Sequence, residues 1–428
     1  MEVVLLFSLL FALMAVGLPI WVAMGGSALI TVGVLGLTDA TTLPTTMAKG
    51  VSSYELLAIP FFILTGELMN RTGMTTRIVR LLMFFLGRLR GGLAYASVGV
   101  NVFASGVSGS APADAAAVSA VMLPAMRKEG YRPERAAAVN ASAAVLGPIM
   151  PPSIPMIFVA LVTNLSIGQL FIGGVGPALL LATALLVLIS WQARRGLLPA
   201  GEGGCRSLGQ LGILVRDALP ALAAPALIVA GIFGGFATIT EIAMLAAAYV
   251  LVVGMVVYRT VKPRDVLGIF TDSAVFSSTI MILFAVVGAF TFVLTLGQLG
   301  ETLSAVVTEL DLGPTAFLLV TMVFFLIVGM PMDAVPAIVI FVPVLLPIAM
   351  ELGVDPIHFG VIVVVNLMIG LLTPPVGALL YVLTKLSTVS FGQLSRAVLP
   401  YVAVLALALL VMTLAPPIVT WLPQAVFG

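Results

Sequence analysis

Apolar and polar positions alternate along this chain on the scale of whole helices. Apolar segments of roughly 15 to 25 residues follow one another and are separated by short polar turns. A helix that crosses a membrane needs about 20 predominantly apolar residues, so the pattern predicts a bundle of spanning helices. The longest polar interruption, from Gln192 to Asp217, lies midway along the chain. We interpret it as a linker between two halves.

The two halves match each other at a constant offset of 223 positions, as from Pro124 to Pro347. The offset also aligns Gly106 with Gly329, Gly130 with Gly353, Pro133 with Pro356, Gly147 with Gly370, and Pro151 and Pro152 with Pro374 and Pro375. Prolines and glycines restrict backbone geometry, so matched positions predict matched folds. The chain is therefore predicted to contain two structural repeats.

Basic residues indicate that the two repeats are inverted. The segment "MRKEGYRPER" (126–135) is basic, whereas its equivalent "AMELGVDPIH" (349–358) carries Glu351 and Asp355 and no Lys or Arg. Because Lys and Arg favour cytoplasmic loops, equivalent loops face opposite sides of the membrane. The resulting topology places both termini outside the cytoplasm and every Lys and Arg except Lys49 on the cytoplasmic side.

The predicted fold is an all-α integral membrane protein with two inverted repeats, about ten transmembrane helices, two re-entrant hairpins and discontinuous helices. The predicted divisions are a first repeat at 1–195 with a hairpin at 91–126 and a broken helix at 136–160, a cytoplasmic linker at 196–218, and a second repeat at 219–428 with a hairpin at 313–350 and a broken helix at 358–384.

The hairpins are predicted from segments with polar centres and short arms. The first has the tip "SGVSGSAPAD" (105–114), and basic residues flank both of its ends. Its arms of about 14 residues are short for a hydrocarbon core of about 30 Å. The second has the tip "VGMPMDAVP" (328–336). Non-helical backbone at membrane depth requires surrounding protein or a wet cavity, so two tips meeting near the midplane predict a binding site.

Each hairpin is followed by a helix that is interrupted by a double proline, in "GPIMPPSIP" (147–155) and in "GLLTPPVG" (370–377). Two adjacent prolines remove two backbone donors, and the freed carbonyl groups can coordinate a cation such as sodium. Side-chain oxygens are available at Ser105, Ser108, Ser110, Ser153, Asp333 and Thr373. We expect one cation between each tip and its broken helix.

Composition excludes several other classes of function. Only 9% of the residues are charged, compared with about 25% in soluble domains. The formal net charge of +1 gives no support to a nucleic-acid partner. Cys205 is the single cysteine, so no intrachain disulfide can form, and the single histidine, His358, is expected in a polar turn outside the membrane. We expect no enzymatic activity, and we interpret Glu241 as a helix cap or packing contact.

The motifs "SGVSGSAPADAAAVSAVMLPAM", "GPIMPPSIPMI", "GIFGGFATITEIAM", "VGMPMDAVPAIVIFVPVLLPI" and "GLLTPPVGALLYV" occur in this order along the chain. Together they resemble the large membrane (M) subunit of tripartite ATP-independent periplasmic (TRAP) transporters, and the resemblance covers essentially the whole chain. It implies sodium-coupled import of an organic acid, such as a C4-dicarboxylate, a sugar acid or sialic acid, across the bacterial inner membrane by an elevator mechanism.

The resemblance also implies two partners, a small four-helix membrane (Q) subunit and a periplasmic substrate-binding (P) protein. Because the chain starts at its first helix, we expect the small subunit to be a separate protein. The implied first sodium site comprises Ser108, Gly109, Ser110, Gly147, Met150 and Ser153, and the second comprises Gly329, Asp333, Gly370, Thr373 and Pro374. The implied substrate contacts are Ser105, Ser110, Pro152, Met330, Pro331 and Pro375.

Two alternatives remain open from the residues. One is a stand-alone dicarboxylate and sodium symporter of similar inverted design, although such proteins favour tips that contain Asn and neither tip here does. The other is an intramembrane aspartyl protease that uses Asp114 and Asp333. Such a protease needs a Gly-x-Gly-Asp context, whereas these residues occur in "APAD" and "PMDA".

Overall fold

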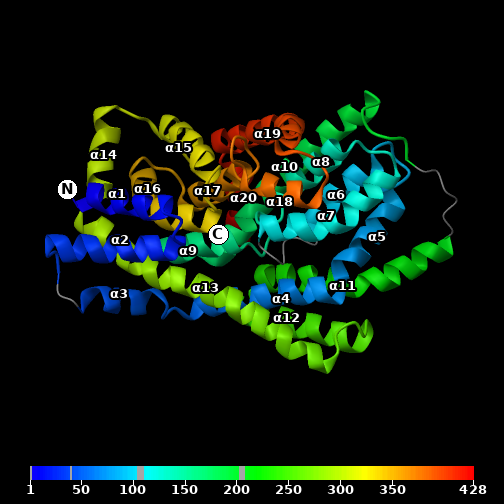
Figure 1. Cartoon of the computed structure of the whole chain (residues 1–428), viewed down its shortest axis with the longest axis horizontal. Coiled ribbons are helices and arrows are strands. Elements are labelled where there is room, and N and C mark those ends of the chain that lie inside the picture. The colour runs from blue at the N-terminus through cyan, green and yellow to red at the C-terminus, as the bar shows by residue number, and fades with distance from the viewer. Residues whose placement is uncertain (1, 39–40, 104–109, 202–207) are drawn as a thin grey trace.

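The structure is a computed structural model that describes residues 2–38, 41–103, 110–201 and 208–428. All regular elements in these ranges are helices, which confirms the predicted all-α class (Figure 1). Figure 1 shows the helices of the two hairpins, α6, α7, α15 and α16, above a layer that contains α3, α12 and α13.

The first half contains α1 (Glu2–Ala15), α2 (Ile20–Leu35), α3 (Thr42–Gly50), the short 3-10 helix η1 (Tyr54–Leu57), α4 (Ala58–Thr72), α5 (Met74–Leu86), α6 (Gly92–Phe103), α7 (Ala111–Lys128), α8 (Pro133–Ala144), α9 (Ile154–Thr163) and α10 (Ile167–Arg194). The hairpin region is thus formed by α6 and α7. The interrupted helix consists of α8 and α9.

The second half contains α11 (Leu208–Gly234), α12 (Ile239–Val252), the π-helical turn η3 (Val253–Val257), α13 (Pro263–Leu296), α14 (Leu299–Glu309), α15 (Pro314–Gly329), α16 (Ala334–Glu351), α17 (Pro356–Gly370), α18 (Ala378–Leu386), α19 (Phe391–Leu414) and α20 (Pro417–Phe427). Moving α7 along the sequence by 223 positions gives the bounds of α16, and the starts of α8 and α17 differ by the same offset. Helix α11 begins inside the range 196–218 that was predicted as a linker.

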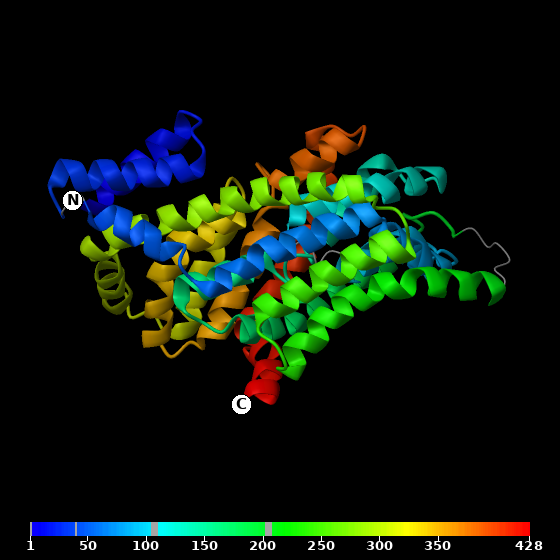
Figure 2. The same cartoon turned by 90° about the horizontal axis from the view of Figure 1, so that it is seen from below.

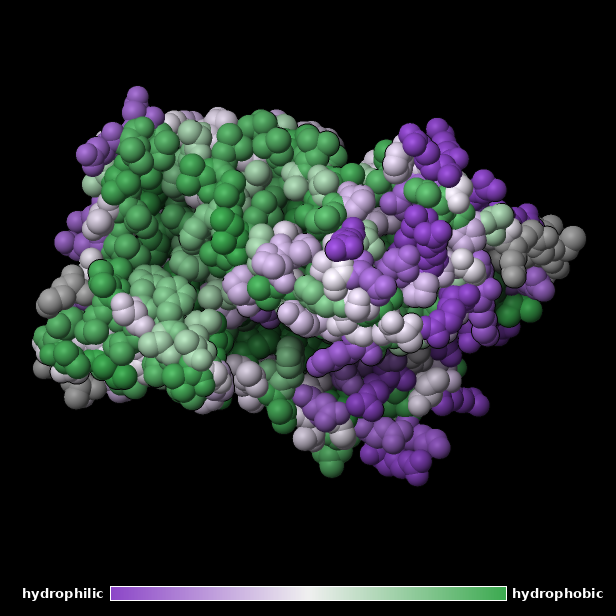
Figure 3. All heavy atoms as spheres, turned by 45° about the horizontal axis from the view of Figure 1, so that its top comes forward, coloured by the Kyte–Doolittle hydropathy of each residue, from purple (hydrophilic) through white to green (hydrophobic). Residues whose placement is uncertain are grey.

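The described residues include six helices that are long and apolar enough to span a membrane, or seven if α3 and η1–α4 form one span bent by 54°. Shorter apolar helices of 10–17 residues, among them α6, α9, α15 and α17, accompany these spans. Figure 3 shows apolar residues over much of the visible surface and polar residues gathered toward one end. These features confirm a multi-pass membrane protein, in which exposed apolar side chains contact lipid.

The long helix α13 has 34 residues and runs beside α3 and α4 (Figure 2). Glycines allow α3 and α13 to touch through their backbones. A Cβ atom on Gly50 would lie 2.7 Å from the carbonyl oxygen of Phe284, and one on Gly288 would lie 2.5 Å from that of Thr46. Any side chain at either glycine would therefore force the two helices apart.

A cluster around Arg77 connects α5, α11 and the end of η3. Its Nε atom lies 3.0 Å from Oδ1 of Asp217, and its guanidinium carbon lies 3.7 Å from the ring centroid of Tyr258. The Tyr258 hydroxyl donates a hydrogen bond of 2.7 Å to the backbone carbonyl of Asp217. Arg77 thus fixes α5 against α11 and the end of η3.

Candidate functional site

The first interrupted helix is held by local hydrogen bonds. Helix α8 ends at Ala144, the chain is not helical across 145–153, and the peptide bond between Pro151 and Pro152 is cis. The buried Ser153 hydroxyl accepts a hydrogen bond of 3.2 Å from the Met156 N–H and donates to the Pro148 carbonyl. Ser153 therefore caps α9, because a side-chain oxygen satisfies one of the free N–H groups at the start of a helix.

The second interrupted helix has the same sequence motif with different local bonds. The peptide bond between Pro374 and Pro375 is again cis, but α18 begins after Gly377, whose φ is +55°. The Thr373 hydroxyl donates a hydrogen bond of 2.7 Å to the Ile369 carbonyl, inside the preceding turn. This break thus has no side-chain cap on α18, and Pro375 is exposed.

Two glycines bring the second hairpin onto the end of α17. A Cβ atom on Gly370 would lie 2.7 Å from Cα of Gly329, and one on Gly329 would lie 3.1 Å from the carbonyl oxygen of Leu367. The end of α15 therefore packs directly on the last turn of α17. The structure brings these two predicted sodium-site positions into backbone contact.

A cavity of about 280 Å³ lies where the two hairpins and the two breaks meet. Ser110 and Asp333 line it from the ends of the two tips, and Pro148 and Leu371 line it from the two breaks. Ser110 and Asp333 are equivalent positions, since they differ by 223. We call this space the central cavity.

Three helices begin at the central cavity. Its lining includes Ser110 and Ala111 at the start of α7, Ile154 at the start of α9, and Asp333 and Ala334 at the start of α16. The Asp333 carboxylate accepts a hydrogen bond of 2.7 Å from the Ala334 N–H. The start of a helix carries partial positive charge and free N–H groups, so this arrangement favours negative charge in the cavity.

Among the predicted site residues that the structure describes, Ser110 and Asp333 are the two that line the central cavity. Ser105, Ser108 and Gly109 lie outside the described residues. The predicted positions that do not line the cavity are Gly147, Met150, Pro152, Ser153, Gly329, Met330, Pro331, Gly370, Thr373, Pro374 and Pro375. Their ion and substrate contacts remain predictions.

The sequence did not point to the wall formed by α13. Phe276, Thr279, Ile280 and Leu283 of this helix line the central cavity, together with Trp21 of α2. Three of these α13 residues are apolar and resemble any other lipid-facing position. The length of the uninterrupted apolar stretch is the one signal that could have marked α13 as a distinct element.

Helix α13 also lines two further cavities, one on each side of the central cavity. A cavity of about 560 Å³ is lined by Asp272 and Phe276 and shares Ser110, Pro112 and Phe276 with the central cavity. This cavity lies at the end of α4 that carries Arg71, whose guanidinium lies 2.7 Å from the Glu67 carboxylate and 3.1 Å from that of Asp272. We call it the inner cavity.

The third cavity, of about 480 Å³, is lined by Lys49 and Asn164 and by α13 from Phe284 to Thr295. We call it the outer cavity. It shares no lining residue with the central cavity. The rings of Phe158 and Phe284 stack with centroids 4.4 Å apart. Phe284 follows Leu283, the last α13 residue that lines the central cavity, and is the first that lines the outer cavity. The central cavity thus shares lining residues with the inner cavity and none with the outer one, beside which the Phe158 and Phe284 rings pack.

Two predictions about single residues can be compared with the structure. His358 is buried in the first turn of α17, and its Nε2 atom lies 2.9 Å from the Met412 carbonyl oxygen, so its expected place in a polar turn was wrong. Its expected place outside the membrane stays a prediction. Glu241 forms a capping box with Thr238, which confirms its interpretation as a helix cap. The described residues contain no cluster of three or more His, Cys, Asp or Glu.

Asp114 and Asp333 do not share the central cavity. Asp114 is buried in the first turn of α7 and is not part of the cavity lining, whereas Asp333 is. The geometry therefore gives no support to a pair of catalytic aspartates.

Comparison with known proteins gives a consistent family match. Residues 7–418 match the family described as "Tripartite ATP-independent periplasmic transporter, DctM component". The chain is 37% identical over 421 residues to the 2,3-diketo-L-gulonate TRAP transporter large permease protein YiaN of Escherichia coli, with 98% of each chain covered. It is 40% identical over 373 residues to the C4-dicarboxylate TRAP transporter large permease protein DctM of Pseudomonas aeruginosa, covering 87% of this chain and 86% of that protein.

Some relatives are longer than this chain. The isethionate TRAP transporter permease protein DctMQ of Oleidesulfovibrio alaskensis is 37% identical over 95% of this chain, which spans 64% of that protein's length. Among solved structures, the YdaH transporter of Alcanivorax borkumensis aligns with a TM-score of 0.63 at 15% identity, covering 88% of this chain and 89% of that one. At this identity the likeness concerns the fold alone.

Proposed function

The chain belongs to the DctM family of TRAP transporter large permease subunits, and on that premise we propose that it imports an organic acid across the bacterial inner membrane in symport with sodium. The observation that carries the proposal is the central cavity, where two inverted tips, two interrupted helices and the starts of α7, α9 and α16 meet. Sites of this kind in secondary transporters hold ions and anionic substrates near the midplane.

An anionic substrate is supported by the electrostatics of the cavity. No Lys or Arg occurs among its lining residues, so a bound carboxylate would rely on the helix starts and on coupling cations. Two relatives are named for 2,3-diketo-L-gulonate and for C4-dicarboxylates, and these compounds carry carboxylate groups. We therefore propose a small organic acid as the substrate class.

We place one sodium ion between each tip and its break, as the resemblance to the family implied. Hydroxyl, carboxylate and backbone carbonyl oxygens are the ligands that hard cations prefer, and Ser110 and Asp333 present such oxygens at the two tips. In this proposal the negative Asp333 favours the second ion more than the neutral Ser110 favours the first.

An elevator movement is supported by how the hairpins and breaks pack on each other. Helix α7 contacts α18, and α16 contacts α9, so each hairpin packs on the interrupted helix of the other repeat. This unit meets α13 along the three cavities. In the proposed cycle the unit slides along α13, and the stacked Phe158 and Phe284 rings close the outer side in the state described here.

Transport in reconstituted vesicles tests the proposal. Proteoliposomes would contain this chain with its small membrane subunit, with the periplasmic binding protein added outside and radiolabelled organic acids supplied as substrates. We expect uptake to require an inward sodium gradient and both partners. Uptake by this chain alone would favour the stand-alone symporter instead, and uptake without sodium would overturn the coupling.

A further inference from the structure

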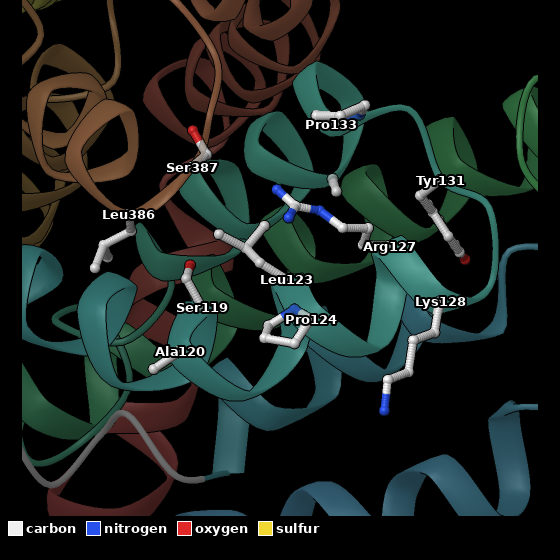
Figure 4. A pocket seen from close by; sticks show the side chains of 11 residues that line it. Ser119, Ala120, Leu123, Pro124, Arg127, Lys128, Tyr131, Pro133, Leu386 and Ser387 are labelled. Atoms are coloured by element: carbon white, nitrogen blue, oxygen red, sulfur yellow. The ribbon is translucent and has the colours of Figure 1, made fainter.

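A fourth cavity, of about 340 Å³, lies apart from the three cavities that α13 lines. It is bounded by the last turns of α7, the start of α8 and the end of α18 (Figure 4). It shares no lining residue with the central, inner or outer cavities. We call it the α7–α18 pocket, and no step of the proposed transport cycle uses it.

The α7–α18 pocket contains an uncompensated positive charge. The Arg127 guanidinium reaches toward Ser387, and its Nη2 atom donates a hydrogen bond of 3.2 Å to the Thr388 hydroxyl (Figure 4). None of the 11 lining residues is acidic. Within the described part of the chain, no carboxylate forms an ion pair with Arg127.

Two hydroxyl groups in the same pocket have no hydrogen-bond partner among the described residues. Ser119 is fully buried in α7, and its Oγ atom forms no hydrogen bond within the described structure, although a helical serine usually donates to the carbonyl four residues earlier, as Ser142 does at 2.8 Å. The buried Oγ atom of Ser387 is also without a partner there. A buried hydroxyl without a hydrogen bond is unfavourable, so both groups are donors available to a ligand.

The remaining lining is apolar apart from Lys128 and Tyr131. Ala120 and Leu123 line the pocket from α7, and Leu386, which is 44% exposed, lies at its rim. A guanidinium and two hydroxyls beside an apolar rim match an amphiphile with an anionic head better than a free anion, which would be surrounded by polar groups. Basic pockets between helices on the cytoplasmic side of a membrane suit anionic lipid headgroups.

The inverted counterpart of this pocket lacks the same chemistry. The positions equivalent to Arg127, Lys128 and Ser119 are Met350, Glu351 and Val342. The basic pocket is therefore a property of the first repeat alone and does not follow from the repeat symmetry. Its sidedness agrees with the anionic surface of the cytoplasmic leaflet.

We propose that the α7–α18 pocket binds the phosphate of an anionic phospholipid, with Arg127, Ser119 and Ser387 as hydrogen-bond donors and the acyl chains leaving past Leu386. Because the pocket joins α7 of the first repeat to α18 of the second, the bound headgroup braces a hairpin arm against the opposite interrupted helix.

Thermal stability of the purified full chain in a non-ionic detergent tests the proposal without a transport measurement. We expect phosphatidylglycerol to raise the Tm and phosphatidylcholine to have no comparable effect. Arg127→Gln should raise the phosphatidylglycerol concentration for half-maximal stabilisation about tenfold, since one charge-assisted hydrogen bond is lost. The control Arg88→Gln removes another exposed positive charge, outside the pocket, and should leave that concentration unchanged.

A second variant separates ligand binding from folding. Ser119→Ala removes a hydroxyl that has no partner in the part of the chain that the structure describes, so the lipid-free Tm should stay the same or rise, while the lipid requirement increases about threefold. Equal effects of Arg127→Gln and Arg88→Gln would overturn the site. If phosphatidylcholine stabilised the protein as much as phosphatidylglycerol, the pocket would not recognise the negative charge of the lipid. If inorganic phosphate stabilised it equally, the ligand would be a free phosphate and not a lipid headgroup.

Discussion

The two interrupted helices have the same double proline and the same cis peptide bond, yet they lie in different surroundings. Around the first break, Pro152 and Ser153 are buried, whereas around the second, Pro375 and Val376 are exposed. The inverted repeat thus preserves the double proline and its cis peptide bond but not the packing around them. The contrast suggests that the first break is a fixed part of the fold and that the second can adapt to a ligand.

The largest expected difference concerns the aromatic residues that follow the breaks at equivalent positions. Phe158 is fully buried and stacks on Phe284 of α13, while Tyr381 is 50% exposed and stacks on Phe391 of α19 with centroids 4.7 Å apart. Phe158→Ala should lower the free energy of unfolding by about 3 kcal/mol, because it leaves a cavity. Tyr381→Ala should lower it by under about 1 kcal/mol. Denaturation in detergent measures both, and equal losses would contradict the comparison.

Backbone contact at the second break gives the next largest effect. Gly370→Ala places a methyl group against the backbone of Gly329 and should destabilise the protein by about 1–3 kcal/mol through overpacking. The matched control is Gly392→Ala, where the added methyl group meets open space. Thermal unfolding of both variants should show a clear loss for the first alone. Similar Tm values would mean that the hairpin and α17 separate easily.

The two tips differ in charge at their equivalent positions. Asp333→Asn keeps the helix cap but removes the charge, so it should raise the sodium concentration for half-maximal uptake about tenfold. Ser110→Ala removes a neutral oxygen and should raise it less. Asp355→Asn, which alters a cap at α17 away from the cavity, is the control. An unchanged sodium requirement in Asp333→Asn would remove this residue from the proposed ion site.

The smallest expected effect concerns the caps of the two half-helices. Ser153→Ala removes the side-chain cap of α9 and should cost about 1 kcal/mol of stability. Val376→Ala, at the equivalent and exposed position, should cost under about 0.5 kcal/mol. Chemical denaturation can resolve the two values. A larger loss for Val376→Ala would reverse the assignment of the first break as the more rigid one.

The parts of the fold that were predictable from sequence depend on local chemistry. Double prolines, glycine-rich tips and basic flanks act on the backbone where they occur, so the breaks at 147–155 and 370–377 and the hairpins could be located. The start of α11 was missed because the polar residues before Asp217 continue into a helix. Polarity alone does not distinguish a loop from the exposed end of a helix.

The parts that could not be predicted depend on contacts between distant segments. His358 is buried in contact with a distant segment, where its Nε2–H donates a hydrogen bond to the Met412 carbonyl, 54 residues away. The α13 wall of the central cavity arises in the same way, from packing that apolar residues do not encode individually. Ser110 and Asp333 were identified because they are polar residues at tips, and their meeting in one cavity required the structure.

The glycine contact between α3 and α13 has a mechanical consequence for the proposed cycle. With Gly50 and Gly288 in backbone contact, these helices cannot move closer at this point. We therefore expect α3 and α13 to form a rigid support. The free energy released when ions move down their gradient would then move the hairpin unit along these two helices, and little of it would be used to bend them.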